Sequence, residues 1–574
     1  MSEAEKMMRV DMGDQSVTVE DFPTEWRLLG GRALSAKILL AECDPGCEPL
    51  SADNVLVFAP GTLTGTAAPT SGRLSVGAKS PLTGGIKEAN VGGNPGQHMA
   101  KLGYRAIIVK GKPADPNKRY GLEVTAEGGK VVECDDLAGI WNYPTCVKLA
   151  ERYSDKASFV TIGPAGEMQL RGASVATTDQ DNRHPARHAA RGGLGAVMGS
   201  KGLKYIACEA GGARARKAAD AKAFAEVTKA MTQKHLGGRQ TYKAGTSAFV
   251  PLANMLHTFP YKNRVEGQSP DVHGLDGARI MERFESRGGG MHNCLTGCIV
   301  KCSNVVHDAD GNYKTSALEF ETITLLGSNL AMTDVDQVAT FDRLCDDLGL
   351  DTIEAGAAIG VWMDAGKLEF GDYEGVKKLF EEEIAKGTEI GKVLGNGTDA
   401  VGEYTGHHRV PTVRGQALPA WDPRPLKATG VTYATSAMGA DHTAGLVVNP
   451  GLQPDAFATA SQEAQLVNAV CDSSGFCMFQ EPTLEVIRQF YSHLYGEEVT
   501  HAQMADMAWE VLSDEWEFNK RAGWKEEDDK LPKCMVDDPI GPAKLIFDVA
   551  PEVIADAKVR KDLTAKLFKL KAQG

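Results

Sequence analysis

Cys294-Leu-Thr-Gly-Cys298-Ile-Val-Lys-Cys302 places three cysteines at intervals of four residues, and a fourth follows far downstream in Asp472-Ser-Ser-Gly-Phe-Cys477. Thiolates are soft ligands, and a [4Fe–4S] cluster needs four of them. Along a helix this spacing would align three thiols on one face, whereas a loop would wrap them around a corner of the cluster. The segment therefore predicts an iron–sulfur cluster.

Two other interpretations compete with the cluster. Structural zinc sites usually consist of two close cysteine pairs. Here the last cysteine has only Cys471 near it, six residues earlier. Buried, unreactive cysteines are also common in protein cores. The spacing favours the cluster over both alternatives.

The length, composition and charge of the chain limit its domain organisation and its possible partners. It has 574 residues, of which 42% are hydrophobic and 24% charged, so we expect a globular protein of several domains. A net charge of −14 argues against nucleic acid or an anionic membrane as the main partner.

The chain carries no targeting or membrane signal that the sequence reveals. The start, Met1-Ser-Glu-Ala-Glu-Lys6, lacks the apolar core of a signal peptide, and no apolar run approaches the length of a membrane span. Twelve cysteines without a paired pattern suit a reducing compartment. We therefore expect a cytoplasmic protein without a membrane span.

The pattern of apolar residues divides the chain into a β-rich part and a helical part. Up to about residue 205, alternation and turn residues predict strands, with helices at 33–41 and 143–152. The predicted strands are 8–12, 16–22, 55–58, 74–78, 106–110, a hairpin over 122–133, 158–162 and 204–208. Beyond Gly211-Gly212 the chain is predicted to be mostly helical, with helices at 213–231, 335–348 and 553–570.

A six-residue motif occurs twice in the helical part. Asp346-Asp-Leu-Gly349-Leu-Asp351 and Asp472-Ser-Ser-Gly475-Phe-Cys477 both have the form Asp-x-x-Gly followed by an apolar residue. A helix predicted to end at Gly349 and another predicted to begin at Thr352 would place free N–H groups beside a carboxylate. The alternative for either copy alone is an ordinary glycine helix end followed by a capping residue.

Two glycine-rich segments interrupt the β-rich part. The first runs from Ser71-Gly-Arg73 to Asn90-Val-Gly92-Gly93, and the second is Ala190-Arg191-Gly192-Gly193-Leu-Gly195-Ala-Val-Met-Gly199. Glycines allow a backbone to face a ligand directly, and arginine suits phosphate. Neither segment matches a P-loop or a dinucleotide-binding motif. Tight turns are the alternative, but together the segments favour a phosphate-bearing cofactor.

These residues resemble the tungsten-containing aldehyde:ferredoxin oxidoreductases over most of the chain. The likeness includes Leu28-Leu-Gly-Gly-Arg32, Lys79-Ser-Pro-Leu-Thr-Gly84, 103–111, 191–201, both Asp-x-x-Gly motifs and Pro419-Ala-Trp-Asp-Pro-Arg424. The resemblance implies an α+β fold. A β-rich base of two pseudo-symmetric sheets (1–210) would precede two mostly helical domains (211–410 and 411–574), with the cofactor at their junction.

The resemblance also implies the cofactors and their residues. Two molybdopterins would hold one tungsten, or molybdenum, and Mg²⁺ would bridge their phosphates. The implied pterin and magnesium residues are Arg73, Asn90, Gly92, Gly93, Ala190, Arg191, Gly192, Gly193, Gly195, Asp346, Gly349, Leu350, Asp351, Asp472, Gly475 and Phe476. Asn90 and the carbonyl of Ala190 would help to hold the magnesium. Cys294, Cys298, Cys302 and Cys477 would hold the [4Fe–4S] cluster.

Catalysis is implied for a glutamate, Glu319 or Glu321, and for His442. A carboxylate could deprotonate a water or a hydrate, and an imidazole could polarise a carbonyl oxygen. Without the resemblance, a surface glutamate and a hydrogen-bonded core histidine would be the preferred interpretation.

The chain departs from the family pattern in three places. Its cysteine spacing is C-x₃-C-x₃-C rather than C-x₂-C-x₃-C, Trp421 stands where a histidine is frequent, and no clear Glu-x-x-His pair exists for an iron between subunits. The oligomeric state therefore stays open, whether with a second copy or with another chain.

The expected activity is oxygen-sensitive oxidation of an aldehyde to a carboxylate with oxygen from water. The electrons would leave through the cluster to ferredoxin or a ferredoxin-like subunit. The alternatives are a reductase of an acyl-CoA, an aromatic thioester or another activated acid on the same fold, an electron-transfer subunit without a catalytic metal, and a structural protein stapled by zinc.

Overall fold

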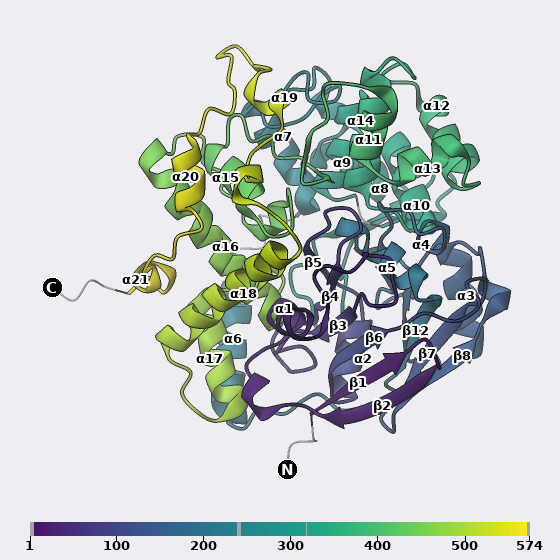
Figure 1. Ribbon diagram of the computed structural model, residues 1–574, viewed down its shortest axis with the longest axis vertical. Coiled ribbons are helices and arrows are strands. Elements are labelled where there is room, and N and C mark those ends of the chain that lie inside the picture. The colour runs from purple at the N-terminus through teal and green to yellow at the C-terminus, as the bar shows by residue number, and fades with distance from the viewer. Residues whose placement is uncertain (1–4, 238–242, 317, 571–574) are drawn as a thin grey trace.

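The computed structural model describes residues 5–237, 243–316 and 318–570, and its first part consists of two six-stranded sheets. The first sheet has the order β2-β1-β6-β3-β4-β5 and the second has the order β8-β7-β12-β9-β10-β11. Figure 1 labels all six strands of the first sheet and β7, β8 and β12 of the second. The strands are β1 (Lys6–Asp11), β2 (Ser16–Asp21), β3 (Leu56–Pro60), β4 (Leu74–Lys79), β5 (Ile86–Val91), β6 (Tyr104–Lys110), β7 (Tyr120–Val124), β8 (Gly129–Glu133), β9 (Ala157–Thr161), β10 (Val175–Thr177), β11 (Arg187–Ala189) and β12 (Leu203–Glu209).

The two sheets repeat one plan. The pairs β1–β6 and β7–β12 are parallel, and the other neighbours in both sheets are antiparallel. A helix follows the second strand of each sheet, α1 (Gly31–Glu42) and α3 (Asn142–Arg152), and another follows the fifth strand, α2 (Pro95–Lys101) and α5 (Leu194–Ser200). The expectation of a two-sheet, pseudo-symmetric base is confirmed.

One apolar core joins the sheets. Met8 and Phe58 from the first sheet and Val160 and Ile206 from the second are fully buried in the same cluster. Successive residues of a strand point to opposite faces, so each sheet can give one face to this core. The edge strand β2 is mostly exposed and ends in two acidic residues, which discourages pairing with another chain.

Two groups of helices lie beyond this base (Figure 1). The first group contains α7 (Val250–Met255), α8 (Gly277–Glu285), α9 (Phe320–Leu325), α10 (Val335–Leu348), α11 (Thr352–Asp364), α12 (Tyr373–Lys378), α13 (Glu389–Gly395) and α14 (Thr398–Thr405). The second contains α15 (Lys427–Thr435), α16 (Phe457–Ser474), α17 (Leu484–Tyr495), α18 (His501–Arg521), α19 (Lys533–Val536), α20 (Pro551–Asp556) and α21 (Thr564–Leu567). The α+β class is confirmed, whereas the domain limits at 210 and 410 stay a prediction.

The helical part holds a feature that the sequence did not predict. A three-stranded sheet of β13 (Gly290–His292), β14 (Ser303–His307) and β15 (Tyr313–Thr315) lies within it. The three-cysteine segment is the connection between β13 and β14. It is therefore a loop and not a helix, with Gly297 at φ 83° and Lys301 at φ 56°.

Two predicted helices are wrong in extent. The helix predicted over 213–231 is α6 (Ala221–Gly237), which begins eight residues later. The single helix predicted over 553–570 is two short ones, α20 and α21. Between them, Gln462 Nε2 donates to the carbonyl oxygens of Ala557 and Val559 at 3.0 and 2.7 Å, and these contacts hold the chain in a non-helical path.

No helix among the described residues is long and apolar enough to cross a membrane. Residues 1–4 belong to the start for which the sequence predicts no signal peptide, and they lie outside the described residues.

Candidate functional site

Two helices end in the turns that the Asp-x-x-Gly motifs mark. α10 ends at Gly349 with φ 75°, and α16 ends at Gly475 with φ 88°. A Cβ on Gly349 would lie 2.8 Å from the backbone nitrogen of Gly163, and one on Gly475 would lie 2.4 Å from Thr64 Oγ1. Glycine is therefore required at both positions, for its backbone conformation and for its small size.

Gly349→Ala is expected to destabilise the protein more than Gly366→Ala. Both glycines have positive φ, 75° and 72°, which costs alanine about 1–2 kcal/mol. Only Gly349 is also crowded by backbone, and overpacking adds about 1–3 kcal/mol. Thermal unfolding of the two variants measures the difference. Equal shifts in Tm would show that the backbone at Gly163 moves at no cost to make room for the added methyl group.

The two turns dock on equivalent points of the two sheets. The backbone N–H of Arg73, just before β4, donates to the Gly475 carbonyl at 3.2 Å. The backbone N–H of Ser174, just before the equivalent strand β10, donates to the Gly349 carbonyl at 2.8 Å. The symmetry of the base therefore extends to the two motifs.

The first aspartate of each turn is buried among polar groups. Arg32 Nη1 lies 3.5 Å from Asp472 Oδ2, and His188 Nε2 lies 3.0 Å from Asp346 Oδ1. Burial, together with the nearby carboxylate of Glu88, raises the pKa of Asp472 well above its usual range. A carboxyl group in such a place can still form hydrogen bonds to a bound group.

The remaining motif residues shape the two turns. Asp351 caps α11 by accepting from the Ile353 backbone N–H at 3.0 Å, and it lies 3.4 Å from Arg191 Nε. Leu350 forms an isolated bridge with Ala173, and Phe476 is fully buried.

The symmetry breaks at one pair of side chains. In the first sheet, Arg73 Nε donates to Asn90 Oδ1, and Arg73 Nη1 lies 3.9 Å from Cys477 Sγ. At the equivalent position of the second sheet, Ser174 Oγ lies 2.7 Å from His188 Nδ1. Only the turn that ends in Cys477 therefore has a guanidinium beside a thiol.

The four cysteines predicted as cluster ligands lie close together. The Cys294 thiol donates to Cys298, which lowers the pKa of Cys298. Cys477 acts to raise the pKa of Cys298 and of Cys302, and Cys294 acts to raise the pKa of Cys477, so the four side chains are near neighbours. All four are free thiols in the structure. Among the described residues, no group of three or more His, Cys, Asp or Glu side chains is placed to hold a single metal ion.

Two arginines give this thiol group a positive surrounding. Arg73 approaches Cys477, and Arg187 donates through Nη2 to Ser303 Oγ at 2.7 Å. Burial opposes their charge, but nearby cysteines and carboxylates together outweigh it, and the pKa of both arginines is raised. The donor set of four sulfurs with nearby cations suits an anionic thiolate-bound cluster.

The three predicted catalytic residues fall in two places. Glu321 Oε1 and His442 Nδ1 lie 3.8 Å apart, and both are buried atoms without a hydrogen-bond partner among the described residues. Glu321 Oε2 accepts from the Ala420 backbone N–H at 2.6 Å, which fixes the carboxylate. Glu319 instead accepts from Thr246 Oγ1 at 2.5 Å and lies near Arg187 and Arg73, on the cysteine side.

The turn before His442 is held by a residue pair that the sequence analysis missed. The fully buried Lys87 donates to Asp441 Oδ2 at 2.5 Å, and Asp441 Oδ1 accepts from the Thr443 backbone N–H at 3.0 Å. Burial opposes ionisation of Asp441, but Lys87 and Arg191 hold its pKa well below the usual range. A lysine inside the buried strand β5 is the signal that could have revealed the pair.

The glycine-rich turns are shaped mainly by contacts with the protein itself. Arg191 donates to the carbonyl oxygens of Ala440 and Ala417, both at 2.6 Å. Its guanidinium group therefore already binds the backbone of the helical part. Ala190 precedes this arginine, and the glycines of both turns pack closely against other groups: Gly92, Gly93, Gly192, Gly193 and Gly195. Their contact with a ligand phosphate, and the magnesium role of Asn90 and Ala190, stay predictions.

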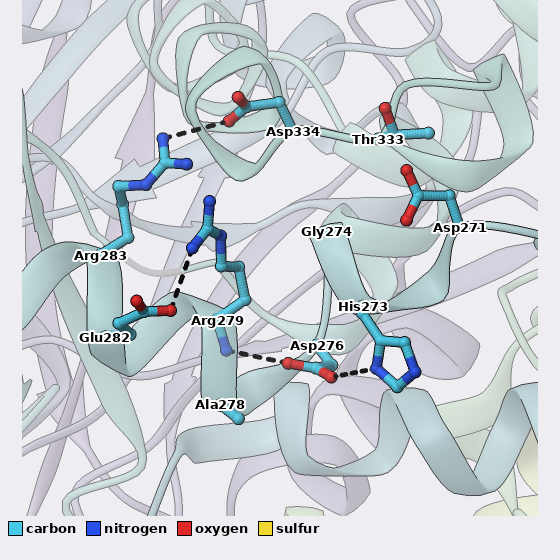
Figure 2. Close-up of a pocket in the computed structure, with 10 residues that line it drawn as sticks. All are labelled: Asp271, His273, Gly274, Asp276, Ala278, Arg279, Glu282, Arg283, Thr333 and Asp334. Atoms are coloured by element: carbon cyan, nitrogen blue, oxygen red, sulfur yellow. Dashed lines mark hydrogen bonds and ion pairs between the residues drawn. The ribbon is translucent and has the colours of Figure 1, made fainter.

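A separate surface cleft shares no residue with this site. Its volume is about 560 Å³, and Figure 2 shows the residues that line it, from α8 and its surroundings. Its arginines are paired: Arg279 lies 3.0 Å from Glu282, and Arg283 lies 3.6 Å from Asp334. Because both of its arginines are already paired with carboxylates, we assign it no role.

Comparisons with known proteins agree on one family. The model described as aldehyde ferredoxin oxidoreductase, N-terminal domain, matches residues 7–210, and the one described as aldehyde ferredoxin oxidoreductase, domains 2 and 3, matches residues 222–557. The tungsten-containing aldehyde ferredoxin oxidoreductase of Pyrococcus furiosus is 31% identical, over 94% of this chain and 93% of the relative.

Two more distant similarities also span most of the chain. The WOR-like subunit of an aliphatic sulfonate oxidoreductase from Pyrococcus furiosus is 27% identical, over 87% of this chain and 83% of that protein. The solved active-site complex BamBC of benzoyl coenzyme A reductase, with 1,5-dienoyl-CoA, superposes with a TM-score of 0.81 at 19% identity, covering 100% of this chain and 95% of that one. The latter likeness supports the fold alone.

Proposed function

Because the chain belongs to the aldehyde ferredoxin oxidoreductase family, we propose that it oxidises an aldehyde to a carboxylic acid. Water supplies the added oxygen atom, and each aldehyde releases two electrons and two protons. Ferredoxin, or a ferredoxin-like iron–sulfur subunit, takes the electrons one at a time.

The residues present fit the cofactors proposed for this reaction. The turns with Asp346, Asp351 and Asp472 would hold two pterins, and Asn90 with the Ala190 carbonyl would hold Mg²⁺. Cys294, Cys298, Cys302 and Cys477 would hold the [4Fe–4S] cluster. When bound, the pterin-held tungsten or molybdenum supplies an acceptor for the electron pair.

One observation carries the proposal: Glu321 Oε1 and His442 Nδ1 are buried atoms 3.8 Å apart, and neither has a hydrogen-bond partner among the described residues. Asp441 Oδ1 lies equally far from His442 Nδ1, at 3.8 Å. Unsatisfied buried polar atoms are costly and need an explanation. A substrate and a water bound beside both atoms would provide one. Glu321 removes a proton from the attacking water, and His442 donates a hydrogen bond to the carbonyl oxygen of the aldehyde.

The neighbours of this pair control its geometry and its access to water. The Ala420 N–H holds one oxygen of Glu321, so the other stays directed at the substrate. The ring of Trp421, 4.8 Å from that of Phe320, forms an apolar wall beside the pair. An apolar wall excludes water that the reaction does not need and favours an apolar group on the aldehyde.

Protein purified without oxygen and supplied with aldehydes and benzyl viologen tests the proposal. We expect aldehyde-dependent dye reduction, and ¹⁸O from labelled water in the carboxylate. Loaded protein that reduces no dye with any aldehyde would contradict it. Activity restricted to reduction of aromatic acyl-CoA thioesters by a low-potential donor would support the alternative, a thioester reductase.

Arg73→Met is expected to lower the reduction potential of the cluster. The guanidinium, 3.9 Å from Cys477 Sγ, stabilises the more negative reduced state, and methionine removes that charge. Arg73→Lys keeps the charge and should shift the potential less. Potentiometric titration followed by electron paramagnetic resonance measures both. A potential unchanged in the methionine variant would show that Arg73 does not tune the cluster.

A further inference from the structure

A basic groove lies on the surface near the cysteine loop. Its volume is about 470 Å³, and it is lined by Ala67, Arg214, Arg216, Lys217, Phe224 and Lys229, among others. These residues come from the loop after β3, from the segment before α6, and from α6 itself. We call this feature the basic groove.

The basic groove carries positive charge that the protein does not neutralise. Arg214, Lys217 and Lys229 are exposed, and none of the three pairs with a carboxylate among the described residues. Arg216 is different, because it pairs with Glu5 and donates to the Thr62 carbonyl at 2.7 Å. Four cations line the groove without an acidic residue, on a chain with net charge −14.

The loop that lines the basic groove also contacts both cysteine segments. The Thr70 N–H donates to the Gly297 carbonyl, and the Thr70 carbonyl accepts from the Cys477 N–H, both at 3.0 Å. Thr70 Oγ1 accepts from the Ile299 N–H at 3.1 Å. Exposed Ala67 lies three residues before Thr70, which limits this separation to about 11 Å even if the chain were fully extended.

A series of aromatic rings makes a second connection. Phe224 lies at the base of the groove, with its ring 4.9 Å from that of Phe490. The ring of Phe490 lies 5.6 Å from that of Phe476. Phe476 is bonded directly to Cys477. The groove therefore connects to a cysteine by close packing without a gap.

We propose that the basic groove is the docking surface of the electron acceptor, and that this acceptor is a small protein with an acidic face. This inference rests on the proposed function. At each encounter the cluster loses one electron and the redox centre of the acceptor gains one, so each aldehyde requires two encounters. Opposite charges speed such encounters, and electron-transfer contacts are characteristically small and weak.

Charge reversal tests the groove against a matched control. The groove variant is Arg214→Glu, Lys217→Glu and Lys229→Glu together. The control is Lys378→Glu, Lys386→Glu and Lys392→Glu, three exposed lysines in the first group of helices, which changes the net charge equally. We expect the groove variant to lower kcat/KM for a small acidic ferredoxin by about 10–10³-fold at low salt. High salt should reduce the difference in kcat/KM between the groove variant and the unaltered protein, because salt screens the charges.

Benzyl viologen separates this inference from the proposed function. Both variants should reduce the dye with aldehyde as fast as the unaltered protein does. If the unaltered protein reduces no dye with aldehyde, the proposed activity is contradicted. If kcat/KM for ferredoxin falls equally in both variants, the assignment of the groove is contradicted. Carbodiimide cross-linking adds a readout without turnover: we expect Lys217 and Lys229 to be joined to ferredoxin carboxylates, and cross-links only elsewhere would overturn the inference.

Discussion

Glu321→Gln is expected to lower kcat for aldehyde oxidation by about 10²–10⁴-fold, the usual contribution of a general base. Glutamine keeps the shape of the side chain, and its carbonyl can still accept from the Ala420 N–H. It cannot take a proton at the position of the unpartnered Oε1, which faces His442 Nδ1 at 3.8 Å. Because the binding contacts are kept, KM should change little.

Glu319→Gln is the matched control for that variant. Glu319 lies two residues earlier, is also partly buried, and accepts from Thr246 Oγ1 near the two arginines of the cysteine side. We expect its change to alter the cluster potential and to leave kcat within several-fold. Steady-state kinetics of both variants with benzyl viologen decide the assignment. A large loss of kcat in Glu319→Gln alone would move the base to Glu319.

Cys477→Ser is expected to give the second large effect. Serine is a harder and weaker ligand for iron than a thiolate, so the cluster should lose iron or fail to assemble. Loss of a residue that only supports a metal ligand typically costs about 10–100-fold in activity. The rate of electron transfer to ferredoxin should fall by at least as much. Iron and sulfide analysis, with electron paramagnetic resonance of the reduced protein, measures the cluster directly.

Cys471→Ser distinguishes a ligand from a neighbouring thiol. Cys471 lies six residues before Cys477, is fully buried, and donates to the Phe476 carbonyl at 3.5 Å, a hydrogen bond that serine can also make. This variant should keep its iron. Loss of iron from Cys471→Ser with retention in Cys477→Ser would exchange the two roles.

The fold was predictable wherever local sequence agrees with the final environment. The hairpin of β7 and β8 was predicted because apolar residues alternate before Gly128-Gly129 and a β-branched pair follows this turn. Strand β5 was missed because Lys87 and Glu88 interrupt its apolar pattern. Both are buried, and Lys87 is neutralised by Asp441, more than 350 residues away. A charge that is balanced by a residue so far away in the sequence leaves no local pattern from which to predict the strand.

The resemblance indicated candidate site residues but not how they are arranged. The sequence singled out Glu319, Glu321 and His442 alike, and only the folded chain separates Glu319 from the other two. His188 was missed because its equivalence to Asn90 depends on strand register, Ser75 opposite Asn90 and Ala176 opposite His188. The roles given to all these residues stay predictions.

Elemental analysis of protein purified without oxygen tests the central claim most directly. The claim is that this chain holds a catalytic tungsten or molybdenum together with a cluster on four cysteines. We predict about one tungsten or molybdenum and about four irons per chain, with acid-labile sulfide. Zinc without sulfide would contradict the cluster, and iron without tungsten or molybdenum in protein that still oxidises aldehydes would contradict the catalytic metal.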